Sequence, residues 1–250
     1  MNGAKFNDIS QGNTGNCFVL SSMGTAATRG VDMDSRITYT GNGYYSVALF
    51  KLNSMGGYSP TTVNVYFNGT LRTTDPAAHF REQEGESWTV IMSRALAQLL
   101  NLDLSTLTGG YAGNPLSAIT GRAPSTTLWS DSSGYTASII NDSRLQLLYA
   151  VGNQVPTVVA TTGAGALDTS LFVPKHVYMV QGVYIAGYLW SQATMQMVPQ
   201  YTVVLYNPHG SDNREVGKTA GARSSGDNTD GLITISGAEF LRSFGEITFA

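Results

Sequence analysis

The stretch Gln11–Leu20, QGNTGNCFVL, contains the only cysteine of this 250-residue chain. Gly15 and Asn16 are turn and helix N-cap residue types, and apolar residues then recur at helical spacing, which predicts a helix over residues 17–28. The free N–H groups and the dipole at a helix N-terminus favour a thiolate. Cys17 is therefore a candidate nucleophile, although a lone cysteine is often just a small buried apolar residue.

Composition excludes several classes of function. Charged residues make up 12% of the chain, the net charge is −3 and the pI is about 5.5, so we expect no nucleic-acid binding. No apolar run is long enough to span a bilayer and the first ten residues are unlike a signal peptide, so we expect no membrane insertion. One cysteine excludes an intrachain disulfide and multi-thiolate zinc sites. The Ser, Thr, Asn and Gly content leans towards a secreted or extracellular protein.

The apolar pattern changes along the chain. Alternation predicts strands within residues 43–71, and helical spacing predicts helices over Ser87–Leu100 and Ser143–Val151. From Val155 onward strand patterns dominate, and the chain ends with a strand (LITI), a short helix over Gly237–Ser243 and a last strand (EITFA). A mainly helical first half and a mainly β second half are typical of an α+β fold.

A nucleophilic cysteine needs a base, and the base needs an orienting partner. Of the three histidines, His79 precedes the long predicted helix and His209 lies in the turn NPHG, and we interpret both as ordinary surface or turn residues. His176 begins the strand HVYMVQGVY, and Asn207 follows the strand YTVVLY. If these strands are adjacent and antiparallel, the Asn207 amide lies beside the imidazole.

The order cysteine, histidine, asparagine favours a thiol hydrolase, with a cysteine–histidine separation slightly larger than is typical of thiol proteases. Gln11 supports this interpretation because a side-chain amide six residues before Cys17 can donate to an oxyanion.

Five stretches, in order along the chain, resemble the catalytic domain of calpain-type, papain-like cysteine peptidases. DISQGNTGNCFVLSSMGTAA is similar to the family pattern QGxxGDCWFLAA, and EGESWTVIMSRALAQL is similar to its E-x-W helix. A loop at Gly109–Gly110 followed by AITG comes next. KHVYMVQGV and VLYNPHG resemble GHAYxVxGV and LxNPWG, and DGLITISGAEFLRSF resembles the end of the domain. The matches cover essentially the whole chain.

The resemblance implies a papain-like two-lobe fold with the active-site cleft between the lobes. Residues 1–122 would form a helical N-lobe carrying the nucleophile, and residues 123–250 an antiparallel β C-lobe carrying the histidine and asparagine. On this resemblance Cys17 is the nucleophile, His176 the base and later the acid, and Asn207 the group that orients the imidazole.

The implied reaction is hydrolysis of peptide bonds in a polypeptide through a thioester acyl-enzyme. Gln11 and the backbone N–H of Cys17 would bind the oxyanion, and the backbone of Gly110 would bind the substrate main chain. A thiolate–imidazolium pair of this type can have a thiol pKa of about 3–4.

The chain departs from the family pattern at four positions. Asn16 replaces Asp and Phe18 replaces Trp, which are mild changes. Lys175 replaces the glycine before the histidine, and His209 replaces the Trp of NPWG, an aromatic residue that shields the His–Asn hydrogen bond.

The family also implies two calcium loops. Asp8 and Glu86 stand where the carboxylates of the first loop would lie, whereas a calcium site needs about six to eight oxygen ligands. In the second loop only Asp230 has a counterpart, and Asn213 and Leu232 stand where acids are expected. We expect no required cofactor, with Ca²⁺ limited to the first site.

Two other functions stay open. The first is a catalytically inactive pseudo-peptidase that acts as a binding or assembly module, suggested by Lys175 and His209. The second is a transglutaminase-like cross-linker, which uses the same kind of catalytic triad. Because the matches begin close to Met1 and stop close to Ala250, we expect an excised domain whose substrates include flanking segments of a longer chain.

Overall fold

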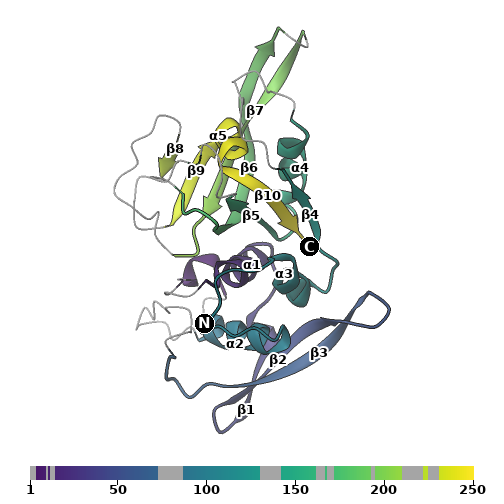
Figure 1. Ribbon diagram of the computed structural model, residues 1–250, viewed down its shortest axis with the longest axis vertical. Helices are drawn as coiled ribbons and strands as arrows, with labels where there is room; N and C mark the ends of the chain where they lie inside the picture. The colour runs from purple at the N-terminus through teal and green to yellow at the C-terminus, as the bar shows by residue number, and fades with distance from the viewer. Residues whose placement is uncertain are drawn as a thin grey trace.

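The fold combines helices with two antiparallel sheets. The computed structural model describes residues 4–9, 11, 15–72, 87–129, 142–161, 167, 172–192, 195–209, 222–224 and 231–250. In this part of the chain, a three-stranded sheet has the order β1-β2-β3 and a seven-stranded sheet has the order β4-β10-β5-β6-β7-β9-β8 (Figure 1). This confirms the mixed α+β class. The papain-like two-lobe arrangement and the boundary after residue 122 stay predictions.

The described part of the first half contains three α-helices, two short 3-10 helices and the small sheet. Its elements are η1 (Phe6–Asp8), α1 (Cys17–Thr28), η2 (Asp34–Arg36), β1 (Ile37–Gly41), β2 (Tyr44–Leu52), β3 (Tyr58–Tyr66), α2 (Trp88–Leu99) and α3 (Gly113–Thr120). Helices α1 and α2 lie where the apolar spacing predicts them. Helix α3 was not predicted, because it begins at a glycine and contains Pro115; proline fits there because the first helical turn leaves its N–H groups unbonded.

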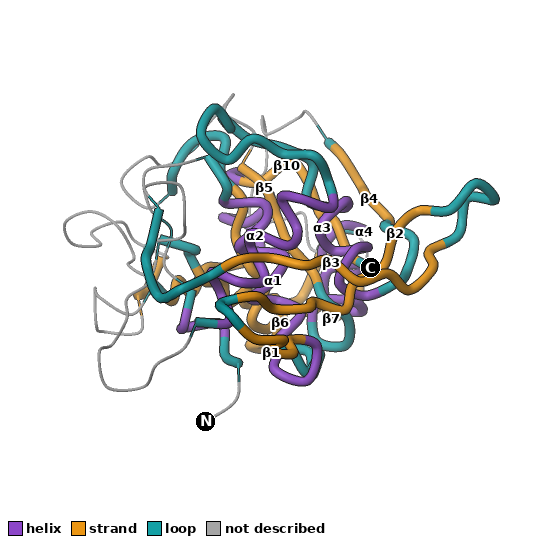
Figure 2. The backbone as a smooth tube through the Cα atoms, turned by 90° about the horizontal axis from the view of Figure 1, so that it is seen from below, coloured by secondary structure: helices purple, strands orange, loops and turns teal. Residues whose placement is uncertain are grey.

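The small sheet adds a β component to the first half, which the sequence predicted to be mainly helical. Strands β1–β3 lie on the side of the molecule from which Figure 2 is viewed, and α2 contacts β2 and β3. Alternation within residues 43–71 predicted two of these strands. The sheet therefore belongs to the core of this half together with its helices.

The second half is dominated by the large sheet. Its elements are β4 (Ser125–Leu128), α4 (Ser143–Gly152), β5 (Thr157–Thr161), β6 (Val177–Ser191), β7 (Gln196–Tyr206), β8 (Ala222–Ser224), β9 (Leu232–Ser236), α5 (Gly237–Ser243) and β10 (Phe244–Phe249). The predicted strand–helix–strand end is confirmed as β9, α5 and β10. Strand β6 is longer than predicted, and the hairpin β6–β7 extends away from the rest of the sheet (Figure 1).

The first half of β6 is buried on both faces, whereas its second half is mostly exposed. Burial on both faces is why the sequence at the start of the strand is a nearly continuous apolar run. Val177 and Met179 belong to the buried cluster that contains α1, α2 and α3. Tyr178 and Val180 point the other way, into a second cluster with residues of α4 and α5. The beginning of β6 therefore lies between the two hydrophobic clusters. No helix in the described part of the chain is long and apolar enough to cross a membrane.

Helix α1 approaches β6 unusually closely. A Cβ atom on Gly24 would overlap the Sδ atom of Met179, so the absence of a side chain at this position permits the contact. One turn earlier, the Ser21 hydroxyl donates a hydrogen bond to the backbone oxygen of Val177 at 2.8 Å. These contacts fix the position of the helix N-terminus relative to the first residues of β6.

We expect Gly24→Ala to lower the free energy of unfolding by about 1–3 kcal/mol, because the added methyl group overpacks the contact with Met179. This loss should appear although alanine is the better helix former by about 1 kcal/mol. Urea denaturation measures it. Gly187→Ala is the control, because a Cβ atom there meets no atom within 4 Å. An equal effect at both glycines would contradict the packing argument.

Candidate active site

Cys17 is the first residue of α1, as predicted, and its residue is only 5% exposed. The preceding turn is held by Gly15, whose N–H donates to the backbone oxygen of Leu107 at 3.0 Å. A Cβ atom on Gly15 would lie 2.6 Å from that same oxygen, so a glycine is required at this contact. The thiol lies near the backbone N–H of Val177, which directly follows His176. The structure therefore brings Cys17 to the beginning of β6.

His176 and Asn207 lie at the same end of two paired antiparallel strands. His176 precedes β6 and Asn207 follows β7, and the pairing of Met179 with Tyr206 aligns these ends. The Nε2 atom of His176 is 3.1 Å from Oδ1 of Asn207, and both residues are buried. This is the neighbourhood that the sequence predicted for the imidazole and the amide.

A second donor fixes the orientation of the Asn207 amide. The backbone N–H of His209 donates to the same Oδ1 atom at 3.1 Å, and an N–H group can only donate. The atom it contacts must therefore be the amide oxygen. Nε2 of His176 must then carry the hydrogen of its bond to Asn207, which leaves Nδ1 as the basic nitrogen of the neutral ring.

Neighbouring groups hold His176 on several sides. The backbone N–H of His176 donates to the Thr161 hydroxyl at 2.9 Å, and its backbone oxygen accepts the backbone N–H of Thr161 at 2.9 Å. The Tyr178 ring and the imidazole meet edge to face at a centroid distance of 5.0 Å, and the His209 ring stacks on the imidazole. The backbone and the ring of His176 are thus both restrained.

Burial opposes charge on both Cys17 and His176. It raises the pKa of the Cys17 thiol, against the smaller lowering effect of nearby backbone N–H groups such as that of Val177. Burial also lowers the pKa of His176 to about 4, with a further lowering by His209 and an opposing effect of the hydrogen bond to Asn207. This arrangement favours a neutral thiol and a neutral imidazole. Desolvation therefore acts against the low thiol pKa that the resemblance implies, and that low pKa stays a prediction.

Gln11 and Gly110 also lie near this region. The backbone N–H of Gln11 donates to the oxygen of Pro208 at 2.6 Å, which joins the segment before Cys17 to the turn after Asn207. At Gly110, the Phe18 ring occupies the space that a Cβ atom would need. Packing against Phe18 thus explains the glycine, and its contact with a substrate backbone stays a prediction.

Two residues next to the site, Lys175 and Asn16, are in unfavourable surroundings. The first has a strained backbone conformation, and the second has a buried polar side chain. Lys175 has φ = +53°, a left-handed conformation that costs a side-chain-bearing residue about 1–2 kcal/mol. This conformation explains why glycine suits the position. Asn16 occupies the N-cap position of α1, but its side chain forms no cap hydrogen bond and is fully buried. The prediction that Asn16 is the N-cap residue is therefore confirmed, but its side chain does not cap the helix.

The calcium prediction finds no support in the described residues, which contain no group of three or more His, Cys, Asp or Glu side chains arranged for a metal ion. Oδ2 of Asp8 accepts hydrogen bonds from the Trp88 indole at 3.0 Å and from the Lys5 backbone N–H at 2.6 Å. This carboxylate therefore links η1 to α2. Glu86, Asp230, Asn213 and also His79 lie outside the described residues.

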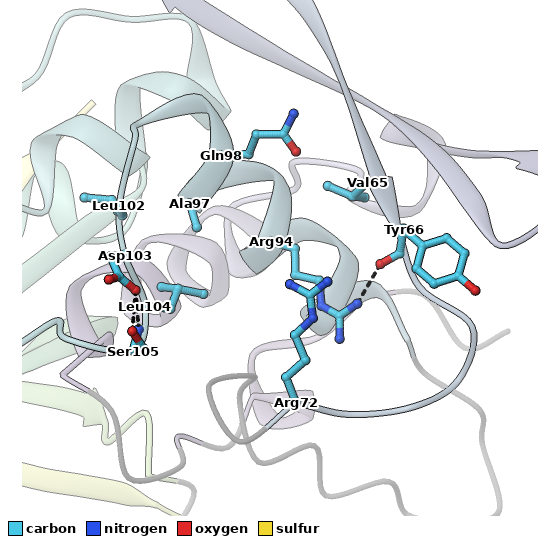
Figure 3. Close-up of a pocket in the computed structure, with 10 residues that line it drawn as sticks. All are labelled: Val65, Tyr66, Arg72, Arg94, Ala97, Gln98, Leu102, Asp103, Leu104 and Ser105. Carbon is cyan, nitrogen blue, oxygen red and sulfur yellow. Dashed lines mark hydrogen bonds between the residues drawn. The ribbon is translucent and has the colours of Figure 1, made fainter.

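A pocket of about 330 Å³ lies elsewhere, between β3, α2 and the segment after it (Figure 3). Arg72 and Arg94 extend into it, and Arg94 donates to the backbone oxygen of Tyr66 at 2.6 Å. Across the pocket, Asp103 accepts hydrogen bonds from Ser105. None of its lining residues is a predicted site residue, so this pocket is separate from the Cys17 region.

Sequence reasoning missed two residues that position the site. Ser21 could have been found, because it lies four residues after Cys17 on the same helix face. Thr161 left no signal in the sequence, because its role depends on the pairing of β5 with β6. Both bind the backbone of the 176–177 segment, so both act on position and not on chemistry.

The buried thiol at the N-terminus of α1 lies near the backbone of Val177, and the preceding residue, His176, is hydrogen-bonded to Asn207. The family model described as calpain family cysteine protease matches residues 1–247. The chain therefore belongs to the calpain family of cysteine proteases. A search of curated proteins found no match.

We expect Thr161→Val to lower the free energy of unfolding by about 1–3 kcal/mol, because it leaves the buried N–H of His176 without its acceptor. Chemical denaturation measures this change. Thr202→Val, at a partly buried position on β7, is the matched control and should change stability by less than about 1 kcal/mol. Similar losses in both variants would mean that the hydroxyl at residue 161 has no special role.

Proposed function

We propose that the protein is an active cysteine endopeptidase that hydrolyses peptide bonds with Cys17, His176 and Asn207. The observation that carries this proposal is the Asn207 oxygen that accepts both the His176 Nε2–H and the His209 backbone N–H. This pair of bonds holds the imidazole in the tautomer whose Nδ1 can accept a proton. The position of Cys17 beside Val177 supplies the nucleophile.

The proposed reaction begins from a neutral thiol and a neutral imidazole. Nδ1 of His176 takes the thiol proton as Sγ of Cys17 attacks the peptide carbonyl carbon, giving a tetrahedral oxyanion. The imidazolium then protonates the leaving amine as the C–N bond breaks, which leaves a thioester. Water attacks the thioester, His176 takes its proton and returns it to the thiol, and the carboxylic acid product leaves.

Several neighbours have supporting roles in this proposal. The side chain of Gln11 and the backbone N–H of Cys17 donate to the oxyanion, which is worth about 3–4 kcal/mol of the barrier per donor. The backbone at Gly110 binds the substrate main chain. The substrate is a polypeptide, including flanking segments of a longer chain where these exist, and no cofactor is required.

The pseudo-peptidase is the second candidate, and one observation favours it. Burial raises the pKa of the Cys17 thiol and lowers that of His176, so the charged pair that attacks most readily is disfavoured in this state. In this alternative the chain keeps the fold and binds polypeptides without cleaving them. Turnover decides between the two.

We expect the wild-type chain to cleave an unfolded protein and Cys17→Ser to reduce kcat/KM by about 10⁴-fold or more, because the hydroxyl is a far weaker nucleophile here. Mass spectrometry of the products measures the cleavage. Met55→Ala is the control, since this side chain is 90% exposed in the β2–β3 turn. Cleavage that persists in Cys17→Ser would rule out the proposed nucleophile, and a wild-type chain that cleaves no unfolded protein would favour the pseudo-peptidase.

The pH dependence should reflect the buried base. His176 acts in its neutral form, and its pKa is lowered from 6.5 to about 4, so it stays neutral as the pH falls through this window. We therefore expect the acid limb of kcat/KM to have its midpoint below pH 6.5. A stopped assay between pH 3.5 and 8 measures it. A midpoint at or above pH 6.5 would show that the imidazole is not desolvated as described.

A further inference from the structure

His209 lies flat on the ring of His176. The two imidazoles are 4.9 Å apart between centroids and only 6° from parallel. The backbone N–H of His209 donates to the Asn207 oxygen that also accepts the Nε2–H of His176. His209 therefore contacts both the ring face of His176, the proposed base, and Asn207, the residue that orients this ring.

The same histidine is bonded to the segment that precedes Cys17. The ring of His209 hydrogen-bonds to the backbone oxygen of Gln11, and the N–H of Gln11 donates to the oxygen of Pro208 at 2.6 Å. Hydrogen bonds therefore run from the turn 207–209 to Gln11 and from Gln11 back to this turn. His209 spans the distance between the base and the residue that carries the proposed oxyanion donor.

Unlike a purely apolar shield, this ring can take up a proton. Two imidazolium ions in a stack at this distance repel each other, so a proton on one ring disfavours a proton on the other. His209 is partly exposed whereas His176 is 4% exposed, so the first proton goes to His209. The other groups shown to contact the two rings are neutral: Asn207, the Tyr178 ring and the Gln11 carbonyl. Lys175, next to His176 in the chain, is exposed.

We propose that His209 is a positioning residue of the proposed peptidase: its neutral ring holds Gln11 and His176 in place, and the two stacked imidazoles share a single proton. A charged His209 then opposes the imidazolium that His176 must form when it accepts the thiol proton. The proposal deepens the proposed function and rests on it for its catalytic part. Burial lowers the pKa of both rings, and His209 lowers that of His176 further; the hydrogen bonds to Asn207 and Gln11 act in the opposite direction on His176 and His209 respectively.

Two substitutions separate the parts of this proposal. His209→Trp keeps a flat ring and an N–H donor but removes the titratable charge, whereas His209→Phe keeps only the flat ring. Titration of the imidazole resonances by NMR is practical because the chain has three histidines. We expect the pKa of His176 to rise by about one pH unit in both variants, because the like charge is gone. An unchanged pKa of His176 in both would overturn the shared proton.

Kinetics at neutral pH tests the link to Gln11. We expect kcat of His209→Trp to stay within about threefold of wild type, and kcat of His209→Phe to fall by about tenfold because the Gln11 carbonyl loses its donor. Equal kcat values in the two variants would overturn this link. The NMR titration needs no turnover, so a wild-type chain without peptidase activity would count against the proposed function while the pKa values still decide the shared proton.

Discussion

The contact between α1 and β6 is the constraint on which the rest of the site depends. Cys17 and His176 are far apart in the chain, and neither has chemistry of the proposed kind without the other. Gly24 lets the helix approach Met179, and the Ser21 hydroxyl binds the backbone at Val177. Because α1 begins at Cys17 and β6 begins just after His176, fixing this contact also fixes the separation of thiol and base.

Forming the site buries polar groups, which is unfavourable in free energy, and hydrogen bonds offset part of this cost. The amide oxygen of Asn207 accepts two of these hydrogen bonds. Thr161 bonds both the backbone N–H and the backbone oxygen of His176. For a charge on the thiol or the imidazole, hydrogen bonds offset burial only in part, so the pKa values of Cys17 and His176 shift in the directions that favour the neutral forms. In the proposed reaction, charge therefore develops only as the substrate carbonyl is attacked. Protein dipoles that point at the site then stabilise the developing charge more strongly than they would in water.

The sequence was sufficient for the elements with strong local patterns. Helix α1 was predicted to its first residue, because the turn residues before Cys17 and the apolar spacing after it agree. Helix α3 was missed, because a glycine start and Pro115 resemble a loop when only local rules are applied. The roles of Thr161 and of the stacked His209 depend on strand pairing and tertiary contacts, which no local pattern encodes.

The most direct test of the account is the rate at which iodoacetamide alkylates Cys17 at neutral pH, in wild type and in His176→Ala. Intact mass reports the reaction without ambiguity, because the chain has one cysteine. If His176 acts on the thiol as a base, the variant should be labelled about 10²-fold more slowly. Equal rates in the two proteins would mean that the buried thiol and the imidazole do not work together, and the proposed mechanism would be wrong.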